Sequence, residues 1–226
     1  MVAKALDKPR KRAPGRPLAG GADPRDALLD AAKLAFARRG FAGASLREIA
    51  REAGVTPALA GYYFGDKAGL LGAVIDHRVA PLAAALGATI AAAGDDAEAA
   101  LRAFVATYVA TAARNRWLPQ LIMREVLNED GVLRETFATR FAGGMAGALL
   151  RAVTQGQRSG MLRSDLAPER LVMSLLSLCI FPFLATPLVS GALGIRVDEA
   201  SAAALAEHHL AIFLAGARPE RMETSR

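Results

Sequence analysis

The sequence predicts an all-α protein, and three observations support that prediction. Apolar residues recur at helical spacing from Asp23 onward, and no segment alternates apolar and polar β-branched residues as a strand does. The pairs Asp23-Pro24 and Thr56-Pro57 are typical of helix starts. The chain has 226 residues, 53% of them hydrophobic and 22% charged, so it can bury a sizeable core. We expect one large or two small helical units.

The net charge of +6 lies entirely in the first part of the chain. Residues 1–67 contain 13 Lys and Arg against 7 Asp and Glu, whereas residues 68–226 contain 15 of each. Concentrated positive charge attracts polyanions, because neutralised phosphates release their condensed counterions. This charge is expected of a surface that faces nucleic acid, and a solvated basic tail is the alternative interpretation.

Residues 1–22 combine basic side chains with Pro and Gly and show no apolar periodicity, which predicts a disordered basic arm. The arm contains Gly15-Arg16-Pro17, which is similar to the core of AT-hook peptides. This resemblance implies that Arg16 enters a narrow A·T minor groove, where the negative potential favours arginine. Plain electrostatic tethering of the arm to DNA is the alternative.

Helix start and stop signals follow one another closely after the arm. The residues expected to cap four successive helices are Asp23, Ser45, Thr56 and Asp66. Ser45 and Glu48 match a capping box, in which each side chain accepts a hydrogen bond from the other's backbone N–H. Gly40 and Gly54 are expected to end the first and second helices. The second and third helices have the proportions of a helix-turn-helix.

The segment from Phe41 to Lys67 resembles the DNA-binding motif of TetR-type transcriptional regulators. The resemblance lies in Gly54 in the turn, the aromatic cluster ending in Phe64, and Lys67 followed by two leucines, and it covers about residues 24–72. It implies a helix-turn-helix DNA-binding domain at 23–70 and an effector-binding and dimerisation domain at 71–226. It also implies a homodimer that releases a palindromic operator when a small molecule binds.

A recognition helix presents its first residues to base edges, while flanking groups hold phosphates. The base-facing candidates are Thr56, Pro57, Ala58 and Gly61. The side chains that match family positions on the DNA backbone are Tyr62, Tyr63 and Lys67, and those that can approach DNA from the second helix are Ser45 and Arg47. The alternatives are that both tyrosines pack in the core and that Ser45 is only a cap.

The predicted recognition helix departs from the usual pattern because the small residues Ala58, Ala60 and Gly61 dominate it. Gly61 stands where a larger side chain is common, and a helix-interior glycine costs roughly 1 kcal/mol relative to alanine. No Arg, Asn or Gln is present in this helix to read a base pair with two hydrogen bonds. Specificity is therefore expected to depend on Arg47, thymine-methyl contacts, DNA shape or the arm.

The remainder of the chain predicts four or five further helices with apolar stripes. The resemblance implies an effector pocket among them, with candidate lining residues Phe104, Tyr108, Trp117, Met123, Arg124, Asn128 and Phe141, and with Glu125 as a further polar contact. Ordinary core packing is the alternative for each residue. The pattern suggests a partly apolar small molecule of unknown charge.

Residues 171–195 contain no charged side chain, and such a run is long enough to cross a bilayer. Pro182, Pro187 and several hydroxyl residues interrupt it, so a helix that faces its own core and a partner subunit is the favoured interpretation. With the final helix, predicted from Asp198 to Gly216, it would form a four-helix dimer interface. The expectation is thus a homodimer with no membrane partner.

The sequence gives little support for an enzyme or a metalloprotein. His77, His208 and His209 lack the spacing of a metal site, no phosphate-binding loop is present, and no cofactor is expected. Cys179 is the single cysteine, so no intrachain disulfide can form, and no signal peptide is recognisable, which favours the cytoplasm. The sequence thus predicts a ligand-responsive transcriptional repressor. An architectural DNA-binding protein without an effector and a membrane-anchored sensor are the rival hypotheses.

Overall fold

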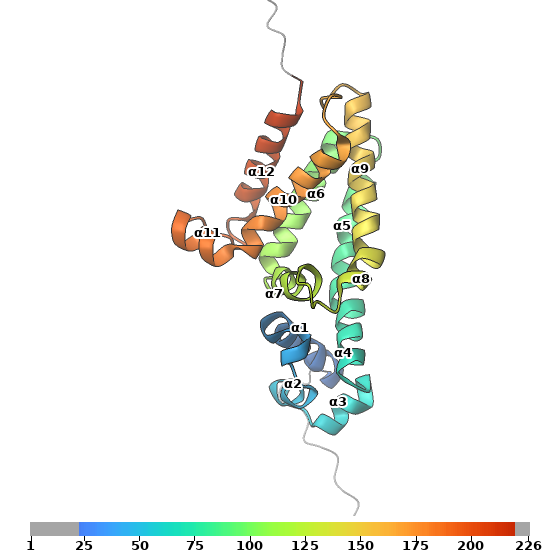
Figure 1. Ribbon diagram of the computed structural model, residues 1–226, viewed down its shortest axis with the longest axis vertical. Coiled ribbons are helices and arrows are strands. Elements are labelled where there is room, and N and C mark those ends of the chain that lie inside the picture. The colour runs from blue at the N-terminus through green and yellow to red at the C-terminus, as the bar shows by residue number, and fades with distance from the viewer. Residues whose placement is uncertain (1–22, 220–226) are drawn as a thin grey trace, which may run out of the picture.

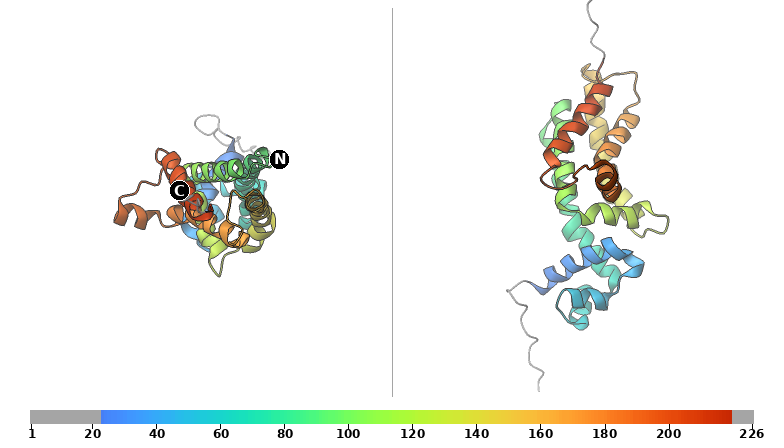
Figure 2. Two further views of the ribbon diagram at one scale, coloured as in Figure 1. Left: turned by 90° about the horizontal axis from the view of Figure 1, so that it is seen from above. Right: turned by 90° about the vertical axis from the view of Figure 1, so that its left-hand side faces the viewer.

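The computed structural model describes residues 23–219, and within that range every regular element is a helix (Figure 1). The all-α prediction is confirmed. The molecule is elongated: the first helices form one end of it, and the helices that follow α5 form the longer body (Figures 1 and 2).

Four helices form the N-terminal end, with bounds α1 Pro24–Gly43, α2 Leu46–Glu52, α3 Pro57–Phe64 and α4 Lys67–Val74. All four predicted capping side chains are confirmed. Asp23, Ser45, Thr56 and Asp66 accept hydrogen bonds from the backbone N–H groups of Arg25, Glu48, Leu59 and Gly69 respectively. The caps satisfy N–H groups that a helix start otherwise leaves without partners.

Gly40 does not end α1 outright, as the sequence suggested, but kinks it. Its φ of 73° and ψ of 172° interrupt the helix, and one further turn follows before Ala44 leads into α2. Few residues other than glycine adopt this backbone conformation. The kink points the end of α1 back toward the body of the molecule.

A continuous 26-residue helix, Lys67–Ala92, joins the two parts of the molecule. It consists of α4, the π-helical segment η1 Ile75–Val79, and α5 Ala80–Ala92. The predicted domain boundary between residues 70 and 71 lies inside it. Movement of one domain relative to the other must therefore involve this helix and the contacts beside it.

Among the described residues, the body contains seven further α-helices and two further π-helical segments. Their bounds are α6 Ala97–Arg114, α7 Trp117–Ile122, η2 Met123–Leu127, α8 Arg134–Phe137, η3 Ala138–Ala142, α9 Gly143–Arg158, α10 Pro168–Leu184 and α11 Thr186–Leu193. The last described helix is α12 Ala202–Ala217, which packs against α6 and α10. It begins four residues later than predicted, because Asp198 and Ser201 form a turn held by reciprocal hydrogen bonds.

The uncharged run at 171–195 is divided between α10 and α11, whose axes differ by 79°. Figure 1 shows α11 projecting sideways from the body. By length and composition, this bent pair and the Lys67–Ala92 helix are the two stretches of residues 23–219 that meet the requirement for a membrane span. The core helices of globular proteins meet the same requirement, and the bend prevents the run from crossing a bilayer as one straight helix.

Two hydrophobic cores underlie this arrangement. One joins α6, α9, α10 and α12, with Phe104 and Leu175 completely buried. The other joins α1 to α4 and also includes Trp117, Leu121 and Leu133 from the body. The N-terminal helices thus share a core with α7, and that shared packing places the end of α1 against η2.

Candidate functional site

The predicted DNA-contacting residues gather on α2 and α3, at one end of the molecule (Figure 1). Seven of them are solvent-exposed: Ser45, Arg47, Thr56, Pro57, Ala58, Tyr62 and Tyr63. Gly61 is half-buried, and a Cβ added to it would meet no atom within 4 Å. No side chain covers the backbone of α3 at Gly61, so a duplex can approach the backbone closely at that point.

Ser45 and Thr56 combine capping with a free donor. Their hydroxyl oxygens accept the N–H groups of Glu48 and Leu59, each at 3.2 Å. A hydroxyl keeps its own hydrogen for donation when its oxygen accepts, so both side chains can still donate to a phosphate oxygen. The cap and the phosphate contact are compatible for these two residues.

Tyr62 and Tyr63 do not pack in the core. The side chain of Tyr62 is 82% exposed, and its ring meets that of Tyr63 edge-on at a centroid distance of 5.6 Å. Tyr63 in turn contacts the ring of Phe64, which is packed against the N-terminal core. The two phenol groups thus stand at the surface on a support fixed by Phe64, where each can donate to DNA.

Lys67 has a structural role that the sequence did not suggest. Its ammonium donates to the carbonyl oxygens of Phe41 at 2.6 Å and Ala44 at 2.9 Å, and lies 4.4 Å from the centroid of the Phe41 ring. A longer contact, 3.5 Å, joins the same ammonium to the carbonyl oxygen of Ala42, so all three donors face the end of α1. The phosphate contact implied by the family resemblance remains a prediction, and a phosphate oxygen would have to replace the long contact to Ala42. Arg16, the arm residue predicted to contact DNA, lies outside the described residues.

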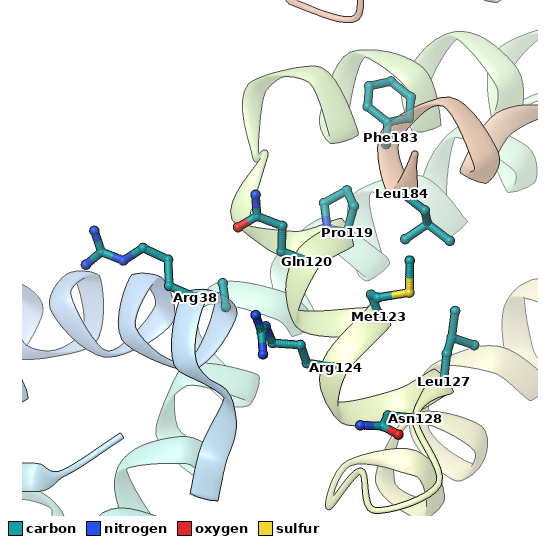
Figure 3. Close-up of a pocket in the computed structure, with 10 residues that line it drawn as sticks. Arg38, Pro119, Gln120, Met123, Arg124, Leu127, Asn128, Phe183 and Leu184 are labelled. Carbon is teal, nitrogen blue, oxygen red and sulfur yellow. The ribbon is translucent and has the colours of Figure 1, made fainter. Parts of the chain in front are cut away.

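A groove of about 700 Å³ lies between the two parts of the molecule, and it includes three of the seven predicted effector residues: Met123, Arg124 and Asn128. Figure 3 shows it running over α7 and η2, with Arg38 of α1 on one side and Phe183 and Leu184 of α10 on the other. Four other groove residues, Arg38, Gln120, Phe183 and Leu184, were not predicted from the sequence. Periodicity identifies the faces of one helix but not which distant helix packs beside it.

The other effector candidates lie elsewhere. Trp117 and Phe141 pack in or against the N-terminal core, where Trp117 also lies under the ammonium of Lys33 at 5.8 Å. Phe104 is completely buried in the core formed by α6, α9, α10 and α12, with Tyr108 packed against it. Burial raises the pKa of Tyr108, with a smaller contribution from Cys179, and burial raises the pKa of Cys179 to about 12. The thiol is therefore protonated and unreactive at neutral pH.

Glu125 was predicted from the sequence to offer a polar contact to an effector, but its side chain does not extend into the groove. Its side chain is buried, and one carboxylate oxygen accepts the backbone N–H of Phe41 at 2.7 Å. The other oxygen lies 3.4 Å from the N–H of Val132. The groove-lining segment η2 is thus bonded directly to the end of α1.

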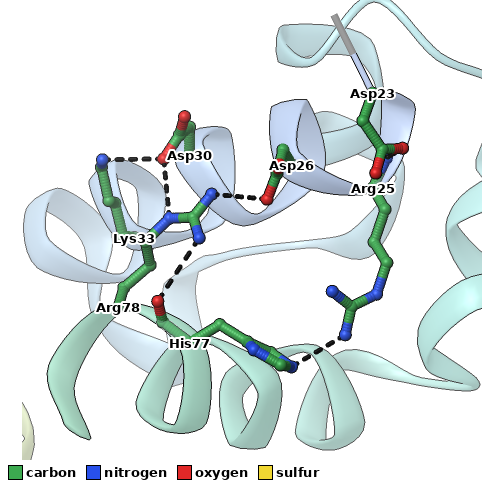
Figure 4. A network of polar contacts seen from close by, with 7 residues as sticks. All are labelled: Asp23, Arg25, Asp26, Asp30, Lys33, His77 and Arg78. Carbon is green, nitrogen blue, oxygen red and sulfur yellow. Dashed lines mark hydrogen bonds and ion pairs between the residues drawn. The ribbon is translucent and has the colours of Figure 1, made fainter. Parts of the chain in front are cut away.

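The other half of α1 is held by an exposed ionic network on η1, shown in Figure 4. Arg78 donates to Asp26 at 2.9 Å and to Asp30 at 3.0 Å, and Lys33 donates to Asp30 at 2.8 Å. Burial alone would raise the pKa of Asp30, but the hydrogen bonds from Lys33 and Arg78 outweigh it and lower the pKa. Opposite these residues, the Arg25 guanidinium donates to the Nε2 atom of His77 at 2.8 Å.

A second groove, about 980 Å³ in volume, lies between α10 and α12. It is mainly apolar and includes the exposed side chains Met173, Phe181, Leu193 and Ile212. His209 also lines it, and the Nδ1 atom of that ring is buried without a hydrogen-bond partner in the described residues. The helices that form this face include the two segments for which the sequence predicts a dimer interface.

Residues 23–219 contain no group of three or more His, Cys, Asp or Glu side chains placed to hold a metal ion. The features present are thus an exposed helix-turn-helix, an interdomain groove and an apolar outer face.

Family models match most of the chain. The model of bacterial regulatory proteins of the tetR family matches residues 28–74, and that of the tetracyclin repressor-like C-terminal domain matches residues 98–212. The transcriptional repressor NicS of Pseudomonas putida is 30% identical over 161 residues, which cover 70% of this chain and 74% of that protein.

Solved structures share the fold at low sequence identity. The hemolysin II regulator HlyIIR superposes with a TM-score of 0.67 at 21% identity, over 87% of this chain and 98% of that one. The regulator FadR of Bacillus subtilis, solved in complex with stearoyl-CoA, has a TM-score of 0.64 at 17% identity, over 82% and 97% of the two chains. At these identities the comparison establishes the shared fold alone.

Proposed function

The chain belongs to the TetR family of bacterial regulatory proteins and is a DNA-binding regulator, not an enzyme; we propose that it is a cytoplasmic homodimeric repressor that a small-molecule effector releases from a palindromic operator. The observation that best supports this proposal is the exposed α2–α3 surface. Its polar and aromatic side chains are positioned by caps and by Phe64, with no apolar partner covering them.

In this proposal, Thr56, Pro57, Ala58 and Gly61 face base edges, and Ser45, Tyr62, Tyr63 and Lys67 hold phosphates. Arg47 is exposed near the start of α2, and its guanidinium can contact a base or a phosphate. Because the small residues Ala58, Ala60 and Gly61 dominate the start of α3, we expect it to approach the duplex closely and to sense thymine methyl groups and groove shape. Arg16 adds a minor-groove contact from the arm.

The α10–α12 face supports the proposed dimer. Phe181 is 58% exposed and Ile212 is 54% exposed, and contiguous apolar surface of this kind is typical of a subunit interface. A two-fold axis through this face would place two α3 helices on one side of a duplex. Half-sites of the operator should then be related by the same symmetry.

The interdomain groove supports the proposed effector site. Met123, Leu127 and Leu184 provide apolar surface, while Gln120 and Arg124 provide polar groups. Arg124 has no ion-pair partner among residues 23–219. An unpaired guanidinium beside apolar side chains suits an anion with an apolar chain, such as a carboxylate or an acyl-CoA.

Selection of bound duplexes from a random-sequence pool at moderate salt tests the DNA-binding function. We expect enrichment of a two-fold symmetric sequence whose half-site centres are separated by one or two helical turns, about 10 base pairs each. Sedimentation of the protein with the selected duplex should show an even number of chains per site. Recovery of the input pool without enrichment would contradict the proposal.

Titration of the preformed complex with saturated fatty acids of increasing length tests the effector site. Release of the duplex by a fatty acid should be weakened by Arg124→Gln and should not change in Arg151→Gln, a matched variant of an exposed arginine on α9. Equal behaviour of the two variants would exclude Arg124 from the effector site.

A further inference from the structure

Glu125 is one of only two buried polar or charged side chains among residues 23–219, with 5% of its surface exposed. No Lys, Arg or His of the described chain lies within ion-pair distance of its carboxylate. Its compensation for burial comes from the N–H of Phe41 and, more weakly, that of Val132. A buried carboxylate without a cation is costly, so packing stability alone does not account for its presence.

The backbone around Phe41 is shaped to receive this carboxylate. Gly40 has a φ of 73°, and a Cβ atom at this position would lie 2.9 Å from the nearer oxygen of Glu125. Glycine is therefore required both by the backbone conformation and by the close approach of the side chain. The kink in α1 and the buried carboxylate form one structural unit.

Phe41 is held from both parts of the molecule at once. Its N–H donates to Glu125 of η2, and its carbonyl oxygen accepts from Lys67 at the start of α4. Lys67 also holds the carbonyl of Ala44, and the next residue, Ser45, caps α2. The position of α2 therefore follows from how Phe41 is bound.

The same η2 segment forms part of the interdomain groove. Met123 and Arg124 precede Glu125 and line the groove, as do Leu127 and Asn128 after it. The segment is π-helical, a geometry often found at functional sites. Any occupant that shifts η2 must also shift the carboxylate bonded to Phe41.

We propose that Glu125 is a positioning residue: through its hydrogen bond to Phe41 it links the groove-lining segment η2 to α1 and keeps α2 and α3 in the orientation that binds DNA. This inference rests on the DNA-binding function proposed above. Loss of the bond releases the end of α1, and water can then solvate the carboxylate. Such a contact has two alternative states that an occupant of the groove can bias.

The first test compares Glu125→Ala and Glu125→Gln with wild type, using the full chain and a duplex selected from the random pool. We expect Glu125→Ala to weaken binding about tenfold or more, within the usual range of coupling between sites. Glu125→Gln keeps one acceptor oxygen and should recover part of that loss. The dependence of affinity on salt should not change, because no phosphate contact is removed.

Val153→Ala is the matched control for stability, because Val153 is completely buried in the core formed by α6, α9, α10 and α12, away from η2. It should lower the thermal midpoint and yet bind the duplex within about twofold of wild type. Hydrogen exchange of the Phe41 amide should accelerate in both Glu125 variants and not in Val153→Ala. Binding within about twofold of wild type by a folded Glu125→Ala variant would overturn the inference.

The second test fills the groove covalently. Met123 is 44% exposed, and the native Cys179 is buried with a raised pKa, so Met123→Cys can be labelled selectively with a maleimide dye. The label should weaken duplex binding when Glu125 is present and have little further effect in the Glu125→Ala background, where the bond to Phe41 is already lost. The same label on Ala106→Cys, an exposed position of α6, is the control.

An equal effect of the Met123 label in both backgrounds would also overturn the inference, because the groove would then act without Glu125. Failure of the proposed function gives a different result, since the wild-type chain would select no duplex at all.

Discussion

The two ends of α1 are held against the rest of the molecule by different physical means. The first half is held by exposed ion pairs from Arg78 to Asp26 and Asp30, shown in Figure 4. The kinked end is held by hydrogen bonds from a buried carboxylate, Glu125, and a half-buried ammonium, Lys67. Exposed pairs contribute little and are screened by salt, whereas buried polar contacts are costly to break.

This difference indicates which end of α1 sets the orientation of the DNA-binding surface. Ser45, the cap of α2, lies just after the kinked end and follows its position directly. The ionic network holds Asp26 and Asp30, which lie in the first half of α1, before the kink. The predictions below alter one end at a time, beginning with the largest expected effect.

Replacement of Lys67 by methionine should have the largest effect on stability. Methionine keeps the packing on the Phe41 ring but leaves the carbonyls of Phe41 and Ala44 without their donor, which should lower the free energy of unfolding by about 2–3 kcal/mol. Urea denaturation measures this change, with Lys67→Arg as the variant that keeps the charge. An unchanged free energy of unfolding would mean that the ammonium is not bound to α1 in solution.

Replacement of Gly40 by alanine should destabilise the kink by about 1–3 kcal/mol, because alanine rarely adopts the required conformation. Part of that loss comes from the contact between the new Cβ atom and Glu125. In a double-mutant cycle, the loss should therefore be smaller in the Glu125→Ala background. Strictly additive free energies would show that the two residues do not interact.

Replacement of Arg78 by alanine should have a smaller effect, below about 1 kcal/mol, and the effect should decrease at high salt. The pKa of Asp30 is lowered in the folded state, so its contribution to stability is present above the unfolded-state value of 3.8 and disappears as the pH falls through the lower folded-state value. Thermal unfolding of wild type and Asp30→Asn should therefore differ at neutral pH and converge in acid. A difference that grows in acid would contradict this assignment.

Tyr62→Phe should have the smallest effect on stability, since it removes one exposed hydroxyl and no core contact. We expect unchanged stability and a loss of binding free energy of about 0.5–1.5 kcal/mol on every duplex tested, because a phosphate contact has no sequence preference. Anisotropy titrations on the selected duplex and on a scrambled one measure this. A loss confined to one sequence would assign the hydroxyl to a base instead.

The sequence was sufficient for the local structure of the N-terminal helices. Capping depends on residues within three positions of each other, so the caps at Asp23, Ser45, Thr56 and Asp66 could all be identified without knowledge of the fold. The reciprocal half of the capping box is the exception. Residues 23–219 show no hydrogen bond from the Ser45 N–H to the exposed Glu48 carboxylate, which water can solvate equally well.

The long-range contacts could not be predicted in the same way. Glu125 and Phe41 are separated by 84 positions, and nothing in their local patterns distinguishes Glu125 from a solvated helix residue. The groove likewise combines α1, η2 and the end of α10, so the family resemblance led to Met123, Arg124 and Asn128 but not to Phe183. Packing between helices that are distant in the sequence determines these sites, and the periodicity of a single sequence does not show which helices pack together.

Amide hydrogen exchange of the full chain, measured with and without a selected duplex, tests the DNA-binding surface most directly. We predict that the duplex slows exchange at residues 41–64, which include α2, α3 and the kinked end of α1, and leaves α10 and α12 unchanged. Saturating duplex with no slowing in α2 and α3 would contradict the account, because DNA would then be bound by another part of the chain.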